Sequence, residues 1–213
     1  MFQSTLSIAK RNLRFDDEVR FIRSWMEKPL STGAVMPSGK PLARTMARYV
    51  DPDVPGPIIE LGAGTGAVTA ALLEQGIESR RMVLVESNPG FCRLLRARYP
   101  EATIVQGDAY ALKRLLREML CSPAAAVVSG LPLFNKPLKF RLRLLAEAFA
   151  LLVPGAPFVQ FTYAVIPPIP SSYSGARAQA SERIWFNLPP ARVWIYRKAQ
   201  ARRRRAVVGG GWS

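Results

Sequence analysis

Three glycines that alternate with small residues directly follow a short apolar run. The run is Ile58-Ile59, the acid after it is Glu60, and the glycines are Gly62, Gly64 and Gly66. Such a run suits a buried parallel strand, and glycines permit a sharp turn with close approach of the backbone to a ligand. The spacing therefore predicts a nucleotide-like ligand at this loop, although Gly62, Gly64 and Ala67 also satisfy the dinucleotide-binding pattern.

Two further acids stand at the ends of predicted strands. Glu86 ends the stretch 81–86, and Asp108 ends the stretch 103–108. With Glu60 they place an acid at the end of three successive strands. This series resembles the class I S-adenosylmethionine-dependent methyltransferases. The resemblance implies S-adenosylmethionine as cofactor, with Glu60 near the methionine ammonium, Glu86 on the ribose hydroxyls and Asp108 at the adenine amino group.

The same resemblance implies a larger set of cofactor-binding positions, at the glycine loop and at the ends of the next strands. The set comprises Glu60, Gly62, Gly64, Thr65, Gly66, Glu86, Ser87, Asp108, Ala109, Ser129 and Gly130. The product expected at this site is S-adenosylhomocysteine.

Composition limits the chemistry and the partners. The chain has 213 residues, 49% hydrophobic content and 30 Lys and Arg against 15 Asp and Glu, a formal charge of +15 that favours anionic partners such as nucleic acid or acidic lipid. It has no histidine, which argues against triad hydrolysis and zinc chemistry, so no metal is expected. Cys92 and Cys121 fall in apolar helical patterns and are expected to be reduced core residues of a cytosolic protein.

The elements that must position these residues alternate along the chain. Strands are predicted near 81–86, 102–106, 124–129 and 157–163, and helices near 41–50, 66–75, 89–98, 110–120 and 138–152. Such alternation indicates right-handed crossovers and a parallel sheet covered on both sides. A final antiparallel pair is predicted from Arg183 to Leu188 and from Arg192 to Lys198, around Pro189-Pro190. The expected fold is α/β, a doubly wound, Rossmann-like seven-stranded class I methyltransferase sheet.

Both ends of the chain are predicted to lie outside this sheet. Phe15 to Lys28 forms an amphipathic, arginine-rich pattern, which suits either packing on the core or binding in a lipid interface, and we favour the interface. The predicted division is therefore 1–50, a membrane-binding extension with a substrate loop, 51–198, the methyltransferase domain, and 199–213, a basic tail expected to be disordered. Ile166 to Ala180 suits either a mobile loop over a site or an ordinary surface crossover.

The strand at 124–129 runs into Ser129-Gly130-Leu131-Pro132-Leu133. Its carboxyl end borders the cleft in a doubly wound sheet, so its backbone carbonyls are placed to accept hydrogen bonds from an incoming amine. Methyltransferases that act on the planar amines of DNA and RNA commonly have Asn or Asp, Pro and an aromatic residue here. This chain has Ser129 and Leu133, and its first aromatic residue after Pro132 is Phe134. A flexible alkyl amine, which needs no stacking surface, is therefore favoured over a flipped base.

Several segments together resemble the rhizobial-type bacterial phospholipid N-methyltransferases over residues 15–198. They are Arg23-Ser24-Trp25-Met26, Gly33-Ala34-Val35-Met36-Pro37-Ser38, the glycine loop, Val128-Ser129-Gly130-Leu131-Pro132-Leu133 and Pro189-Pro190-Ala191-Arg192-Val193-Trp194. The resemblance implies successive methylation of phosphatidylethanolamine towards phosphatidylcholine by a peripheral enzyme on the cytoplasmic face of the inner membrane. It implies anionic membrane as partner, no specific nucleic acid, and a monomer. An RNA adenine dimethyltransferase, an ornithine lipid N-methyltransferase and a membrane-surface binding protein without activity are the alternatives.

Methylation of a protonated amine requires that a proton leave first. The catalytic candidates are Tyr49 and Tyr163 as proton acceptors, with Ser129 at the end of the fourth strand. The expected substrate-binding residues supply donors and cations for an anionic head group, a contact beside the amine and an aromatic face for a quaternary ammonium. They are Lys28, Ser38, Lys40, Arg44, Leu131 and Tyr173, with Trp185 as a second aromatic candidate.

Overall fold

The computed structural model describes residues 39–187 and 189–199. The predicted helix at 15–28, the substrate-binding candidates Lys28 and Ser38, and the basic run 202–205 lie outside these residues. The predicted division of the chain into 1–50, 51–198 and 199–213 therefore stays a prediction.

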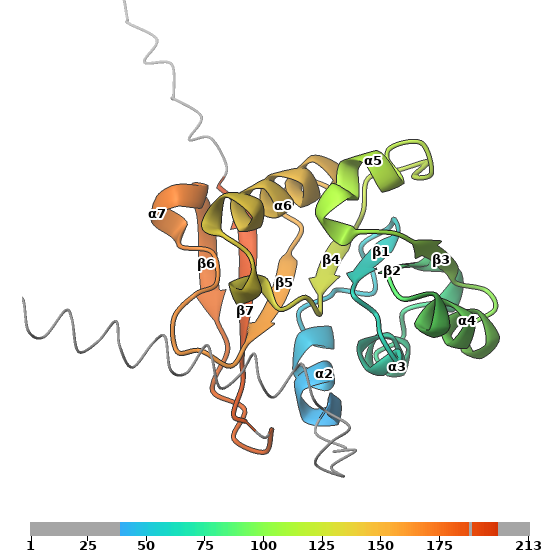
Figure 1. The fold of residues 1–213 in the computed structure, drawn as a ribbon, viewed down its shortest axis with the longest axis horizontal. Coiled ribbons are helices and arrows are strands. Elements are labelled where there is room, and N and C mark those ends of the chain that lie inside the picture. Colours follow the sequence, from blue (N-terminus) through green and yellow to red (C-terminus); the bar gives the residue numbers. More distant parts are fainter. Residues whose placement is uncertain (1–38, 188, 200–213) are drawn as a thin grey trace, which may run out of the picture.

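Seven strands form one sheet in the order β3-β2-β1-β4-β5-β7-β6 (Figure 1). The strands from β3 to β5 run parallel, and β7 pairs antiparallel with both β5 and β6. This arrangement confirms the predicted fold class. The strands are β1 (Ile58–Leu61), β2 (Met82–Glu86), β3 (Thr103–Gln106), β4 (Ala126–Ser129), β5 (Phe158–Thr162), β6 (Ala176–Ala180) and β7 (Arg192–Lys198).

Helices cover both faces of this sheet, because strands buried on both faces require a layer on each side. One face carries α2 (Gly39–Ala47), α3 (Ala67–Glu74) and α4 (Pro89–Arg98), and the other carries α5 (Leu112–Leu116) and α6 (Leu138–Leu151). The short helix α7 (Ser171–Ser174) and the 3-10 turns η1 (Ser79–Arg81), η2 (Ala109–Ala111) and η3 (Leu133–Asn135) complete the connections.

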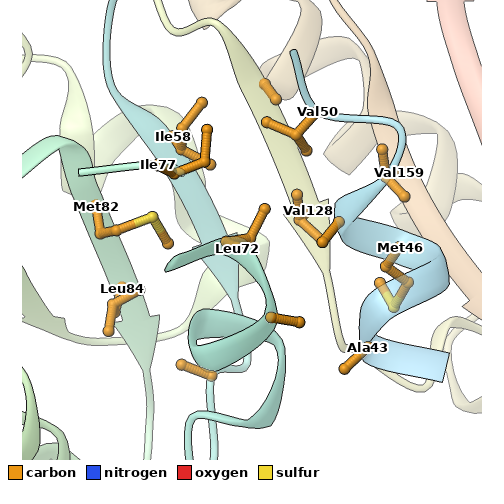
Figure 2. Packing of buried hydrophobic residues seen from close by; sticks show 14 of the residues in the cluster. Ala43, Met46, Val50, Ile58, Leu72, Ile77, Met82, Leu84, Val128 and Val159 are labelled. Atoms are coloured by element: carbon orange, nitrogen blue, oxygen red, sulfur yellow. The ribbon is translucent and has the colours of Figure 1, made fainter. Parts of the chain in front are cut away.

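Successive strand residues alternate between two apolar cores. Ile58 packs with Leu72, Met82 and Val128 beneath α2 and α3, whereas Ile59 packs on the α6 side. Figure 2 shows the first core, in which Met46 of α2 lies over β4 and β5 near Val128 and Val159. All four residues of β1 are buried, so its register between β2 and β4 is fixed by packing on both faces.

The predicted strand at 183–188 is wrong. Ile184 forms a single bridge with Ala191, and the partner of β7 is β6, inside the segment 166–180 that was expected to be a loop. Alternating aromatic and apolar residues suggested a strand, but Trp185 and Phe186 are exposed at a turn. The Arg-Ala-Gln pattern of β6 has weak strand propensity, so its structure depends on pairing with the long β7 rather than on local sequence.

The predicted burial of the two cysteines holds for one of them. Cys92 is buried in α4, but Cys121 is exposed in the connection after α5. The reason is that the helix expected over 110–120 ends at Leu116, so the periodic pattern no longer determines which side residue 121 faces.

Arg81 fixes the connection from α2 to β1. Its guanidinium donates to the carbonyl oxygens of Pro52 at 2.7 Å and Gly56 at 3.0 Å, and also to that of Val54. We expect Arg81→Lys to lower the free energy of unfolding by about 1–3 kcal/mol, because an ammonium cannot serve three carbonyls in this planar arrangement. Urea denaturation measures the change. Arg80→Lys is the control, since Arg80 is exposed and pairs with Glu78; equal losses in both variants would contradict the assignment.

Candidate active site

The carboxyl ends of β1 and β4 meet where the strand order reverses, which is the ligand-binding position of doubly wound sheets. Two backbone hydrogen bonds hold the following loops against neighbouring strands. Gly62 N donates to Val85 O at 2.8 Å, and Gly130 N donates to Leu61 O at 2.8 Å. The glycine loop and the segment after β4 therefore form one continuous rim at this edge.

All three glycines of the loop adopt positive φ angles, 71° at Gly62, 54° at Gly64 and 82° at Gly66. A Cβ on Gly62 would lie 2.9 Å from the Leu131 side chain, and one on Gly66 would lie 2.7 Å from the Tyr99 ring. A Cβ on Gly64 would have nothing within 4 Å. The loop is thus closely packed at its two ends and open at its centre, which leaves the backbone around Gly64 accessible to a ligand.

Glu86 connects the glycine loop to the start of α4. Its Oε2 accepts a hydrogen bond from Gly64 N at 2.9 Å, and its Oε1 accepts one from Asn88 N at 2.8 Å. Asn88 then caps α4, because its Oδ1 accepts from Gly90 N at 2.7 Å. The carboxylate predicted to bind ribose hydroxyls therefore lies at the open centre of the loop.

Glu60 is a buried carboxyl beneath the first turns of α3. Its Oε2 accepts a hydrogen bond from Thr69 Oγ1 at 2.7 Å. Burial raises the pKa of Glu60 to about 8, with the Thr69 hydrogen bonds lowering it and the charge of Glu86 raising it slightly. This carboxyl is mostly protonated near pH 7. A cationic group bound beside it would lower its pKa and favour its ionised form, which fits the predicted place of the methionine ammonium.

The other predicted cofactor contacts lie around the same rim. Asp108 is exposed, and its Oδ1 accepts from Tyr110 N at 2.9 Å, while Ala109 beside it is buried. Thr65 and Ser87 are exposed on the loops after β1 and β2. The cofactor role of each of these residues stays a prediction.

The segment after β4 is held by a residue that the sequence analysis missed. Ser129 is buried, and its Oγ accepts from Leu131 N at 3.4 Å. Gln160 of β5 is paired in register with Ser129, and its Nε2 donates to Leu131 O at 2.9 Å and to Phe161 O at 2.7 Å. A glutamine inside the apolar run Phe158 to Thr162 was the signal available in the sequence, because a buried amide requires polar partners.

The two candidate tyrosines lie at different edges. The start of α2 lies beside the glycine loop, since a Cβ on Gly39 would lie 3.6 Å from Ala67. Tyr49 follows the other end of this helix, next to Val50, which packs near Ile58 at the start of β1 (Figure 2). This position lies towards the opposite end of β1 from the rim, and the catalytic role of Tyr49 stays a prediction.

Tyr163 directly follows β5 at the edge that carries the rim. Its ring meets that of Phe161 edge-on, with centroids 5.3 Å apart. Burial raises the pKa of Tyr163, an effect opposed by a hydrogen bond with the Asn187 side chain. The phenol therefore keeps its proton near pH 7, which suits it to hydrogen bonding better than to accepting the proton of a substrate ammonium.

The structure does not bring all predicted substrate contacts to the rim. Leu131 is there, in contact range of Gly62. Arg44 instead forms an exposed ion pair with Glu74 of α3 at 3.0 Å, and Lys40 is exposed at the start of α2. Ala178 in the middle of β6 pairs with Tyr196 of β7, and Tyr196 also pairs with the first residue of β5. The residues that precede β6, Tyr173 among them, therefore lie beyond the edge of the sheet opposite the rim. Because α7 precedes the start of β6, Tyr173 lies away from the rim, and its expected cation-π role stays a prediction.

Comparisons with known proteins agree with this geometry. The family model described as ribosomal RNA adenine dimethylase matches residues 49–122. Together with the seven-stranded fold, this match makes the chain a class I S-adenosylmethionine-dependent methyltransferase, with S-adenosylmethionine as its cofactor. A "Methyltransferase from Pyrococcus furiosus" shares the fold, with a TM-score of 0.56 at 15% identity over 87% of this chain and 99% of that one.

Two curated proteins show similarity of different extent. An "Ornithine lipid N-methyltransferase" from Singulisphaera acidiphila is 28% identical over 83% of this chain and 94% of its own length. A "Ribosomal RNA small subunit methyltransferase A" from a Synechococcus strain is 34% identical, but over 42% of this chain and 30% of its own length.

Within residues 39–187 and 189–199, no cluster of side chains is suited to hold a metal ion, and no helix is long and apolar enough to cross a membrane.

The pKa of Glu60 gives a test of the site. Because the folded pKa of about 8 lies above the ordinary value of 4.5, the stability contributed by the protonated form is complete below about pH 4.5 and is lost as pH rises through 8. Each unit of difference corresponds to about 1.4 kcal/mol. The side chain in Glu60→Gln is neutral at every pH. In protein without cofactor, the melting temperature of this variant relative to the wild type should therefore be higher at pH 9 than at pH 5.

The control for this comparison is Glu74→Gln, which removes an exposed carboxylate on the neighbouring helix. If the melting temperatures of Glu60→Gln and wild type decline in parallel from pH 5 to pH 9, Glu60 does not titrate as a buried carboxyl.

Proposed function

We propose that this methyltransferase transfers methyl groups from S-adenosylmethionine to the primary amine of a membrane lipid. The observation that carries the proposal is the rim segment Ser129 to Leu133. Leu131 packs on Gly62, and its carbonyl is held by Gln160, so an aliphatic side chain and backbone carbonyls line the place where an acceptor amine would meet the cofactor loop. This surface suits a flexible alkyl amine and offers little for stacking a base.

The match to the ribosomal RNA adenine dimethylase family model does not reach this segment. That match ends at residue 122, before β4 begins at Ala126, and so covers the cofactor half alone. The Synechococcus ribosomal RNA methyltransferase is matched over 30% of its length, whereas the ornithine lipid methyltransferase is matched over 94%. The part of the sheet that would contact the substrate therefore favours the lipid relative.

Two lipid amines meet these requirements. Phosphatidylethanolamine is favoured by the segments that resemble phospholipid N-methyltransferases, and successive methylation would lead to phosphatidylcholine. Ornithine lipid is favoured by the relative that matches most of this chain. Both present a primary amine and an anionic group on a lipid, so one site chemistry serves either.

The chain's residues would orient the amine rather than activate the methyl donor. When bound, S-adenosylmethionine supplies a methyl group already activated on a sulfonium. Because burial raises its pKa, Tyr163 keeps its proton. We assign its phenol oxygen the role of accepting an N–H of the deprotonated amine, which leaves the nitrogen lone pair free to attack the methyl group. The ammonium proton passes to solvent as the amine enters the rim, because partial desolvation there and the positive charge of the sulfonium both lower the pKa of the ammonium.

Apolar side chains gather at the substrate edge of the sheet. Trp185 and Phe186 are 70% and 92% exposed, and Val165 and Ile166 are exposed after β5. The two turns are neighbours, because Tyr163 hydrogen-bonds with Asn187 and Thr162 pairs with Arg192. Arg183 lies over the Trp185 ring at 5.2 Å. An aromatic patch with a cation beside it suits the interface of an anionic bilayer, so we propose peripheral binding at the cytoplasmic face of the inner membrane.

The first experiment incubates the purified protein with labelled S-adenosylmethionine and vesicles of anionic lipid that contain phosphatidylethanolamine or ornithine lipid, beside small-subunit ribosomal RNA. We expect methylated lipid in at least one vesicle sample, read by mass spectrometry, and none in the RNA. The variant Glu86→Ala, which removes the carboxylate at the open loop, should lose at least about tenfold in rate, the effect of one lost charge-assisted hydrogen bond. Labelled RNA beside unmodified lipid would overturn the proposal.

Membrane binding is tested by replacing both exposed aromatic residues of the turn. We expect Trp185→Ser with Phe186→Ser to weaken binding to anionic vesicles by at least about tenfold, since burial of such a side chain is worth about 1.5–3 kcal/mol. Vesicle sedimentation measures the change. The control is Phe91→Ser on α4, an exposed aromatic residue outside this patch. Equal vesicle binding by the wild type and the double variant would remove this edge from the interface.

A further inference from the structure

Three buried polar atoms without hydrogen-bond partners lie together on the sheet at the substrate edge. They are Gln160 Oε1, Arg192 Nε and Trp194 Nε1, half of the six such side-chain atoms in the described part of the chain. Buried polar atoms in folded proteins are nearly always paired, so a local concentration of unpaired ones requires an explanation.

The strand register brings these three residues to one face. Gln160 of β5 pairs with Trp194 of β7, and Thr162 pairs with Arg192. Phe158 and Tyr196, two residues away along the same strands, belong to the α6 core, and side chains alternate along a strand. Gln160, Arg192 and Trp194 therefore face the α6 side, where Leu131 also packs.

Arg192 stands at the edge that carries the rim. It is the first residue of β7 and pairs with the last residue of β5, one strand beyond Gln160 and two strands from β4. Neighbouring strands lie about 4.8 Å apart, so the backbones of Arg192 and of the chain leaving β4 are separated by about 10 Å. An arginine side chain together with the short spacer between the amine and the anion of a lipid head group can cover this distance.

No acidic side chain among residues 39–187 and 189–199 pairs with the charge of Arg192. Among the described residues it forms no ion pair, whereas Arg44, Arg80 and Arg143 each do. Arg192 and Trp194 are half-buried as residues, so a ligand at the sheet edge can approach them. A guanidinium beside an indole N–H offers donors in the arrangement that binds a phosphate or carboxylate group.

We propose that Arg192 and Trp194 bind the anionic group of the substrate head group, while Gln160 fixes the Leu131 carbonyl at the amine end. This inference rests on the proposed lipid substrate and names the residues that select a zwitterionic head group over a simple amine. The anion is the phosphate of phosphatidylethanolamine or the carboxylate of ornithine lipid. The Gln160 amide cannot be reversed, because its Nε2 already faces two carbonyl oxygens.

The test measures head-group binding and turnover separately. Glycerophosphoethanolamine and Nα-acetylornithine are titrated by NMR into protein loaded with S-adenosylhomocysteine. We expect Arg192→Gln to weaken binding of at least one by about ten- to hundredfold, the effect of a lost charge-assisted hydrogen bond, and Trp194→Phe to weaken it by about two- to tenfold. The probe with the larger loss identifies phosphate or carboxylate as the anion.

Turnover then separates recognition from a structural role. With vesicles of the lipid that the wild type methylates, Arg192→Gln should raise the KM for that lipid at least about tenfold. Turnover of a long-chain primary alkylamine, which has no anion, should be unchanged. Arg197→Gln is the control, since Arg197 lies on the same strand at its opposite end, where it pairs with Arg177. Equal losses on both substrates would indicate packing or a buried water site and overturn the inference.

The outcomes also distinguish this inference from the proposed function. If the wild type methylates lipid and Arg192→Gln matches it in KM and head-group binding, the anion site is wrong and the lipid activity stands. If the wild type methylates RNA alone and binds neither head-group compound, both fail.

Discussion

The site depends on the close approach of two loops at the strand-order reversal. Gly130 N reaches Leu61 O, Gly62 N reaches Val85 O, and a side chain on Gly62 would collide with Leu131. These contacts hold the cofactor loop close against the segment after β4. Because transfer of a methyl group is an in-line displacement, holding donor and acceptor elements in one rigid rim supplies the main catalytic requirement.

The buried carboxyl of Glu60 near this rim has a consequence for stability. Glu60 lies where its ionised form is disfavoured. Burial raises its pKa to about 8, although the hydrogen bonds from Thr69 act to lower it. Such a residue weakens the protein without ligand as pH rises, and a bound cation would remove that penalty. Local instability at a functional site is expected when the geometry serves a ligand rather than the empty fold.

The sequence was sufficient for the fold of the cofactor half, because its signals are local. Apolar runs, acids at strand ends and alternating glycines identify β1 and β2 without knowledge of the rest. The second half was harder. The strand β6 has little propensity of its own and forms through pairing with β7, so the aromatic turn at Trp185 was mistaken for the strand. The sequence also does not show which edge of the sheet a helix end reaches, so it could not place Tyr49 and Tyr173 relative to the rim.

The residues that the sequence could not identify point to one kind of substrate. Arg192 and Trp194 belong to a segment that the sequence singles out, but they become neighbours of Gln160 only through the register of β5 with β7. On one side of them lies the Leu131 carbonyl, and on the other an exposed turn with Trp185 and Phe186. A base in RNA would use neither an isolated arginine on the α6 face nor an apolar turn. The zwitterionic lipid that we propose as substrate would use both, because its amine, its anion and its acyl chains follow one another in the same order as these surfaces.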